Sequence, residues 1–191
     1  MTTPRWPGLL ALAFFAIHAV WGVSTGRPTN MLWACHLAAL GVGVGILARA
    51  PAVNALAVLW FCAGVPLWLF DVATGGELLP TSISTHAGGM IVGLWGVRAL
   101  GMPRGVWWKA AIGVVLLQLV SRAVSDATEN ANLAYSVPAG WELTFPSHLA
   151  FLLLNLSCAT ATFAAGAPLL RWSLSRPAPA EAREARSGVP G

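Results

Sequence analysis

Cys35 and the four histidines are the residues of this sequence whose types could carry chemistry. Cys35 directly precedes His36, and His18, His86 and His148 lie in other apolar stretches. A thiolate is a nucleophile, and an imidazole can take the proton of a thiol or bind a metal ion. Consecutive helical residues point about 100° apart, so His36 is poorly placed to act as a base for its neighbour. The pattern therefore predicts His86 as the base for Cys35, with His18 or His148 orienting it.

Further polar side chains in or beside apolar stretches extend this set. We predict supporting or substrate-binding roles for six residues: His18, His36, Asp71, Arg122, Asn132 and His148. Ser121, Arg122 and Asn132 are the candidates for stabilising an oxyanion. The remaining cysteines, Cys62 and Cys158, stand among apolar neighbours and form no CxxC motif, so we interpret them as small buried hydrophobic residues.

The elements that must position these residues are membrane helices. Hydrophobic residues make up 57% of the 191 residues and charged residues 9%, whereas soluble domains carry roughly 25% charged residues. Because about 20 apolar residues span a bilayer as a helix, we predict an all-α bundle of about six transmembrane helices. The predicted ranges are 6–24, 31–48, 53–73, 80–100, 107–126 and 145–171. They form a single domain over 1–172, followed by a disordered cytoplasmic tail over 173–191. The first range lacks a convincing cleavage site, so we interpret it as a retained helix and not a signal peptide.

The distribution of basic residues predicts the orientation, because cytoplasmic segments of membrane proteins are enriched in Lys and Arg. With both termini cytoplasmic, the inner segments hold Arg5, Arg49, Arg98, Arg104, Lys109, Arg171, Arg176, Arg183 and Arg186. The outer segments hold Arg27, Arg122 and the acidic residues Asp71, Glu77, Asp126, Glu129 and Glu142. The net charge of +4 therefore reflects topology in a bacterial inner (plasma) membrane and excludes nucleic acid as a partner.

The same topology places the polar residues at one depth. Counting about 1.5 Å per residue from the outer helix ends puts all four histidines and Cys35 in the outer half of the membrane. Ionisable groups are costly in a bilayer and generally face a bundle interior or a water-filled cavity. Several of them at one level on different helices therefore predict a polar site that opens to the periplasm or exterior.

Three stretches resemble the YwaF-like integral membrane proteins of bacteria and their animal relative, a cysteine acyltransferase of ether phospholipids. They are the segment 31–37 with its Cys35-His36 pair, the segment 78–86 ending at His86, and the Asn-rich segment 129–138. Trp33 and Ala34 depart from the residues that precede the cysteine in that family. The resemblance implies an acyl-accepting Cys35, His86 as its base, and a phospholipid or lysophospholipid as substrate, with no cofactor.

Two other chemistries are open at this point. Histidine and carboxylate ligands bind Zn²⁺, so His18, His86, His148 and Asp71 could form the site of a zinc-dependent lipid hydrolase. Two facing histidines of a bundle could instead ligate haem, and a non-catalytic membrane protein is a further alternative. The first hypothesis is a phospholipid acyltransferase, transacylase or acyl hydrolase that works through a Cys35 thioester.

Overall fold

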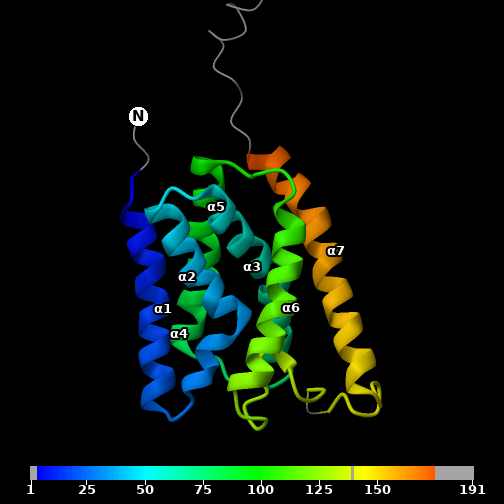
Figure 1. Ribbon diagram of the computed structural model, residues 1–191. Helices are drawn as coiled ribbons and strands as arrows, with labels where there is room; N and C mark the ends of the chain where they lie inside the picture. Colours follow the sequence, from blue (N-terminus) through cyan, green and yellow to red (C-terminus); the bar gives the residue numbers. More distant parts are fainter. Residues whose placement is uncertain (1–3, 139, 175–191) are drawn as a thin grey trace, which may run out of the picture.

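The computed structural model describes residues 4–138 and 140–174, and within them it contains helices and no strands. The long helices, labelled in Figure 1, are α1 (Trp6–Ser24), α2 (Ala34–Leu47), α3 (Pro51–Ala73), α5 (Gly89–Leu100), α6 (Val106–Val124) and α7 (His148–Leu174). The short helix α4 (Pro80–Ile83) and the π-helical turn η2 (Ser84–Gly88) run without a break into α5. Two 3-10 turns, η1 (Pro28–Leu32) and η3 (Ala131–Leu133), complete the fold. The predicted all-helical class is confirmed.

Within the described residues, four helices are long and apolar enough to cross a membrane, judged by length and composition. They are α1, α3, α6 and α7, with mean hydropathies of 1.7, 1.9, 1.3 and 1.7. Helix α2 is apolar but shorter, since it begins at Ala34 and not at the predicted residue 31. Helix α7 extends to Leu174, two residues into the segment predicted as a tail, and residues 175–191 lie outside the described part.

Helices α2 and α3 form the centre of the bundle, and glycines allow their close approach. A Cβ on Gly41 would lie 3.0 Å from the Cβ of Ala57, and one on Gly45 would lie 2.6 Å from the backbone nitrogen of Asn54. The small-residue face of α2 therefore packs on α3. Helix α5 packs on both of them, since a Cβ on Gly93 would lie 2.7 Å from Val58 of α3 and 2.9 Å from Val42 of α2.

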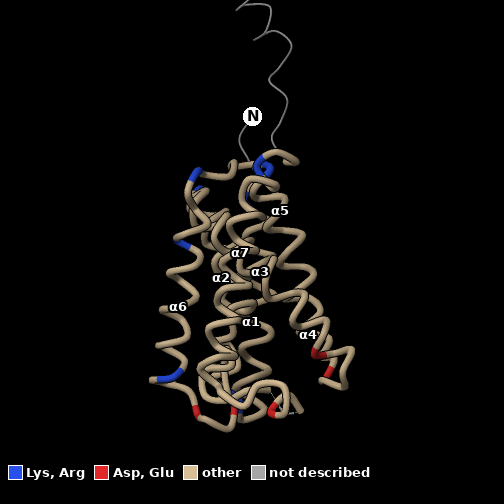
Figure 2. Tube along the Cα trace, turned by 90° about the vertical axis from the view of Figure 1, so that its right-hand side faces the viewer, with Lys and Arg blue, Asp and Glu red and all other residues tan. Residues whose placement is uncertain are grey.

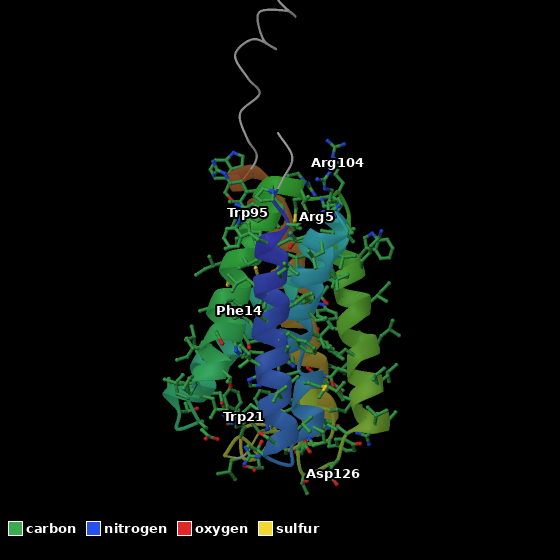
Figure 3. The ribbon with its side chains drawn as sticks, turned by 90° about the vertical axis from the view of Figure 1, so that its left-hand side faces the viewer. Arg5, Phe14, Trp21, Trp95, Arg104 and Asp126 are labelled. Atoms are coloured by element: carbon green, nitrogen blue, oxygen red, sulfur yellow. The ribbon has the colours of Figure 1, made fainter. Side chains whose placement is uncertain are left out.

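Charges separate to the two ends of the bundle, as Figure 2 shows by colour. The end where α1 begins and α7 ends is called the basic end and holds Arg5, Arg49, Arg98, Arg104 and Arg171. The opposite end is called the acidic end and holds Asp71, Glu77, Asp126, Glu129 and Glu142, together with Arg27 and Arg122. Figure 3 labels Arg5 and Arg104 at the basic end and Asp126 at the acidic end.

Helix α7 is held to the bundle by a group of contacts near the basic end. There Arg171 donates hydrogen bonds to the carbonyl oxygens of Met102 (3.1 Å) and Pro103 (3.0 Å), while Phe163 and Ala167 are buried. Towards the acidic end α7 diverges from α6 (Figure 1). Cys158 lies on this diverging part and is exposed, so its interpretation as a buried hydrophobic residue was wrong.

Candidate active site

A cavity of about 670 Å³ lies between the acidic-end halves of α2, α3, α6 and α7. We call it the chamber. Its polar wall includes Cys35, His36, Asp71, His86, Gln118 and Asn132. Its apolar wall includes Trp60, Leu67, Phe70, Leu154, Ala159 and Phe163. Its volume lies in the range of ligand pockets, which are mostly apolar with a few convergent polar groups. The predicted nucleophile and base thus line one cavity.

Cys35 lies in the first turn of α2, and its sulfur rests on α3. A Cβ at position 64 would overlap the Cys35 Sγ, so only glycine fits there. The first-turn amides of a helix have no partner within the helix. The His36 and Leu37 amides donate to the Trp33 carbonyl oxygen at 2.9 and 3.1 Å. The Cys35 amide lies at the positive end of the helix dipole and faces the Cys35 thiol.

Asn132 connects this helix start to α6. Its Oδ1 accepts a hydrogen bond from the Ala34 amide, and its Nδ2 donates to the Leu32 carbonyl and to Ser121 Oγ, all at 2.8 Å. Gln118 Nε2 donates to the Asn132 carbonyl oxygen at 2.5 Å. Asn132 has φ +53°, a left-handed conformation that asparagine tolerates better than most residues. Its side chain is fully used in holding the start of α2, and it is therefore a positioning residue.

His86 lies in the π-helical turn and is held on two sides. Its Nδ1 lies 2.8 Å from the Ser82 carbonyl oxygen, so Nδ1 carries the proton and Nε2 is left with a lone pair. Its ring stacks on Trp68, with 4.5 Å between ring centres and 9° between planes. Trp68 follows Gly64 by four residues, about 6 Å along α3. Helix α3 thus carries the contacts of both Cys35 and His86 within about one turn.

Three of the four histidines form a row across α1, α2 and the π-helical turn. The ring centres of His18 and His36 are 4.0 Å apart, and those of His36 and His86 are 5.5 Å apart. His36 Nδ1 donates to the Asn30 carbonyl oxygen at 2.7 Å, and His18 Nδ1 lies 3.0 Å from Thr81 Oγ1. Because these rings are in direct contact, a haem between any two neighbours would require them to move apart.

The remaining predicted residues lie elsewhere. His148 Nε2 donates to the Leu133 carbonyl oxygen at 3.0 Å and lines a separate hollow of about 560 Å³. Arg122 donates to the Ala134 carbonyl oxygen at 2.8 Å and lies over the Tyr135 ring. Asp71 lines the chamber at the end of α3. The predicted zinc ligands are therefore spread over two sites, and no group of three or more His, Cys, Asp or Glu in the described residues could hold one metal ion.

Several chamber residues escaped the sequence reasoning. Trp60, Gly64 and Trp68 follow one another at helical spacing along α3 and share one face of it with the predicted Asp71. That periodicity was readable from the sequence, but tryptophans in a membrane helix are also typical of its interfacial ends. Gln118 of α6 is a further buried polar residue, and its Oε1 has no hydrogen-bond partner in the described part of the protein.

No family model, curated protein or solved structure matches this chain. The family resemblance of the three short segments therefore stays a prediction, and the functional argument rests on the chamber alone.

Proposed function

We propose that this chain is a membrane enzyme that transfers or hydrolyses a lipid acyl group through a thioester on Cys35, with His86 as the base. The observation that carries the proposal is that Cys35 and the lone-pair-bearing side chain of His86 line the same largely apolar chamber. A cavity that is lined mostly by apolar side chains, with a few polar groups, suits a lipid acyl chain that carries its polar ester group at one end.

We place the protein in the plasma membrane as a bundle of six membrane-crossing helices with both termini in the cytoplasm. Four helices meet the length expected of a span, and the continuous helix from Pro80 to Leu100 is also long enough. Helix α2 together with η1 supplies the sixth crossing. The separation of basic and acidic ends agrees with this orientation, since Lys and Arg concentrate on the cytoplasmic side. The chamber then lies in the outer half of the membrane.

The first half-reaction forms the thioester. His86 Nε2 takes the proton from Cys35 Sγ, and the sulfur attacks the ester carbonyl carbon of a phospholipid. The tetrahedral intermediate collapses when the C–O bond to the glycerol oxygen breaks. That oxygen takes the proton back from His86, so a lysophospholipid leaves and the acyl group stays on Cys35.

The second half-reaction returns the enzyme to its starting state. The hydroxyl group of a lysophospholipid, or water, gives its proton to His86 Nε2 while its oxygen attacks the thioester carbonyl. The C–S bond breaks, and the Cys35 sulfur regains the proton from His86. The products are a new phospholipid when a lipid is the acceptor and a free fatty acid when water is.

Both steps develop a negative charge on the carbonyl oxygen, which needs hydrogen-bond donors. Two donors lie at the chamber: the Cys35 amide in the first turn of α2, and Trp68 Nε1, which is buried and has no hydrogen-bond partner among the described residues. Of the earlier candidates, Ser121 and Arg122 do not line the chamber, and the Asn132 side chain is engaged at the start of α2. We therefore assign the oxyanion to the Cys35 amide and the Trp68 indole.

Intact-protein mass spectrometry tests this function. Purified protein is incubated with mixed phospholipids, and wild type is compared with Cys35→Ser and His86→Ala. A fatty-acyl adduct that hydroxylamine removes and that Cys35→Ser lacks is the expected result. Lysolipid production that persists in Cys35→Ser without an adduct would contradict it. In that event, metal analysis and a visible spectrum would show whether zinc or haem chemistry at the histidines takes its place.

A further inference from the structure

Some apolar side chains that line the chamber are also exposed on the surface of the bundle. Leu67 and Phe70 of α3 and Leu154 of α7 line the chamber and are 51%, 47% and 50% exposed. Cys158, one turn along α7 from Leu154, also lines it and is exposed. A side chain that borders a cavity and is also exposed marks an opening of that cavity. The opening therefore lies on the side of the bundle, between the acidic-end parts of α3 and α7.

A chain of aromatic rings crosses the gap between α3 and α7 near the acidic end. Phe70 of α3 contacts Trp141 edge-on at 5.4 Å between ring centres. Trp141 stacks on Phe145 at 5.8 Å, and Phe145 contacts Phe151 of α7 at 5.3 Å. These distances are those of favourable aromatic pairs. We call this chain the aromatic bridge; it bounds the opening on the side of the acidic end.

The chamber is closed towards the basic end. The lining residues nearest that end are Trp60 of α3, Val114 of α6 and Phe163 of α7. Trp60 is fixed because its Nε1 donates to the Ala110 carbonyl oxygen at 3.0 Å, and Phe163 is 1% exposed. From Phe151 to Phe163 the α7 wall is about 18 Å long. The chamber is thus an elongated apolar slot that is closed towards the basic end, bounded by the aromatic bridge towards the acidic end, and open on the side of the bundle.

We propose that this opening is a lateral portal through which a bilayer lipid inserts one acyl chain, so that the acyl donor is a membrane lipid and not a water-soluble acyl carrier. The proposal rests on the proposed function for the chemistry at Cys35. An acyl chain that moves sideways from the bilayer into an apolar slot stays in apolar surroundings throughout, so the transfer costs little hydration free energy.

Charge also disfavours a soluble acyl carrier. Such carriers are generally phosphate-bearing anions. The carboxylates of Asp71 and Glu142 lie next to the bridge residues Phe70 and Trp141 in the chain, whereas Glu77 pairs with Arg27 at 3.9 Å. Like charges repel an approaching anion and slow its association. A lipid headgroup of either charge can stay at the membrane surface while only its chain passes the portal.

Alkylation of Cys35 tests the portal without requiring turnover. In a Cys62→Ser/Cys158→Ser background in liposomes, Cys35 is the single thiol. Its modification by a maleimide with a long alkyl chain is compared with its modification by a sulfonated, membrane-impermeant maleimide. The portal variant is Leu67→Trp/Leu154→Trp. The matched control is Leu69→Trp/Leu153→Trp, at neighbouring leucines that are 54% and 57% exposed but do not line the chamber.

The expected result is faster labelling of Cys35 by the alkyl maleimide than by the sulfonated one. The portal variant should slow the alkyl reagent about tenfold or more, and the control should leave its rate unchanged. The widening variant Leu154→Ala should raise the rate relative to Leu153→Ala, which keeps the test decisive if the tryptophan variant does not fold. Equal rates for both reagents, no labelling in the parent protein, or equal effects in portal and control variants would overturn the portal.

The labelling experiment and the search for an acyl adduct test the portal and the chemistry separately. If the alkyl maleimide labels Cys35 faster and only the portal variant slows it, but the wild-type protein forms no acyl adduct, the proposed function is overturned and the portal is retained. An acyl adduct on Cys35 with equal labelling by both maleimides would do the reverse.

Discussion

The Cys35 sulfur lies directly against the backbone of Gly64, where any side chain would overlap it. One turn further along α3, Trp68 stacks on His86. A single helix therefore sets the positions of both the nucleophile and the base that we propose.

Replacing Gly64 with alanine should displace Cys35 and destabilise the bundle. Forcing a methyl group into a packed contact typically costs about 1–3 kcal/mol. We expect a lower unfolding temperature, measured in detergent by tryptophan fluorescence. We also expect a changed rate of Cys35 alkylation. Gly166→Ala is the control, because its Cβ would lie 3.5 Å from Leu59, an ordinary contact. A Gly64→Ala protein as stable as Gly166→Ala would show that the contact is not tight.

Asn132→Gly should weaken the hold on the start of α2. Glycine accepts the positive φ but removes three side-chain hydrogen bonds, each worth about 1 kcal/mol. We expect a lower unfolding temperature and a changed alkylation rate of Cys35. Asn130→Gly removes the hydrogen bonds from the Tyr135 and Ser136 amides to Asn130 Oδ1, away from α2. Its alkylation rate should equal that of wild type, and a change as large as that of Asn132→Gly would refute the positioning role.

His86→Phe should separate the stacking of His86 from its chemistry. Phenylalanine can still stack on Trp68, so the unfolding temperature should change little, while loss of the base should lower acyl transfer by about 10²–10⁴-fold. Acyl transfer is measured as release of lysolipid from a labelled phospholipid. His148→Phe, at the histidine that contacts Leu133 outside the chamber, should retain activity. Equal losses in both variants would argue against His86 as the base.

The proposed orientation can be tested with single cysteines in a cysteine-free background. Thr128→Cys at the acidic end should react with an impermeant maleimide added to intact cells, because that end faces outward. Ser173→Cys near the basic end should react only after the cells are opened. The reverse pattern would invert the topology and place the chamber in the inner half of the membrane.

Asp126 should contribute to stability only above acidic pH. The pKa of its carboxyl group lies below the ordinary value of 3.8 because the amide and hydroxyl of Thr128 donate hydrogen bonds to it, both at 2.8 Å. A lowered pKa in the folded state stabilises the protein above the ordinary pKa, and this contribution disappears as the pH falls through the lowered value. The unfolding temperatures of wild type and Asp126→Ala should therefore differ near neutral pH and converge once the pH falls below the lowered pKa. A difference that persists in acid would assign the effect to another cause.

The sequence alone determined the fold class and the level of the polar residues. Long apolar runs with few charges allow little besides membrane helices, because the backbone must satisfy its own hydrogen bonds in lipid. The position of a residue along a helix fixes its depth, and Cys35, His36 and His86 do line one chamber. The sequence could not separate His148 from this set, since depth says nothing about which side of the bundle a residue faces.

The tertiary structure decided the contacts around the chamber and its opening. Asn132 reaches the start of α2 only because the 130–133 segment takes up left-handed conformations, which no local pattern predicted. The exposure of Cys158 follows from the divergence of α7, which depends on contacts of Arg171 and Phe163 far along the same helix. Such features arise from packing between segments distant in sequence, whereas hydropathy and spacing report only on each segment by itself.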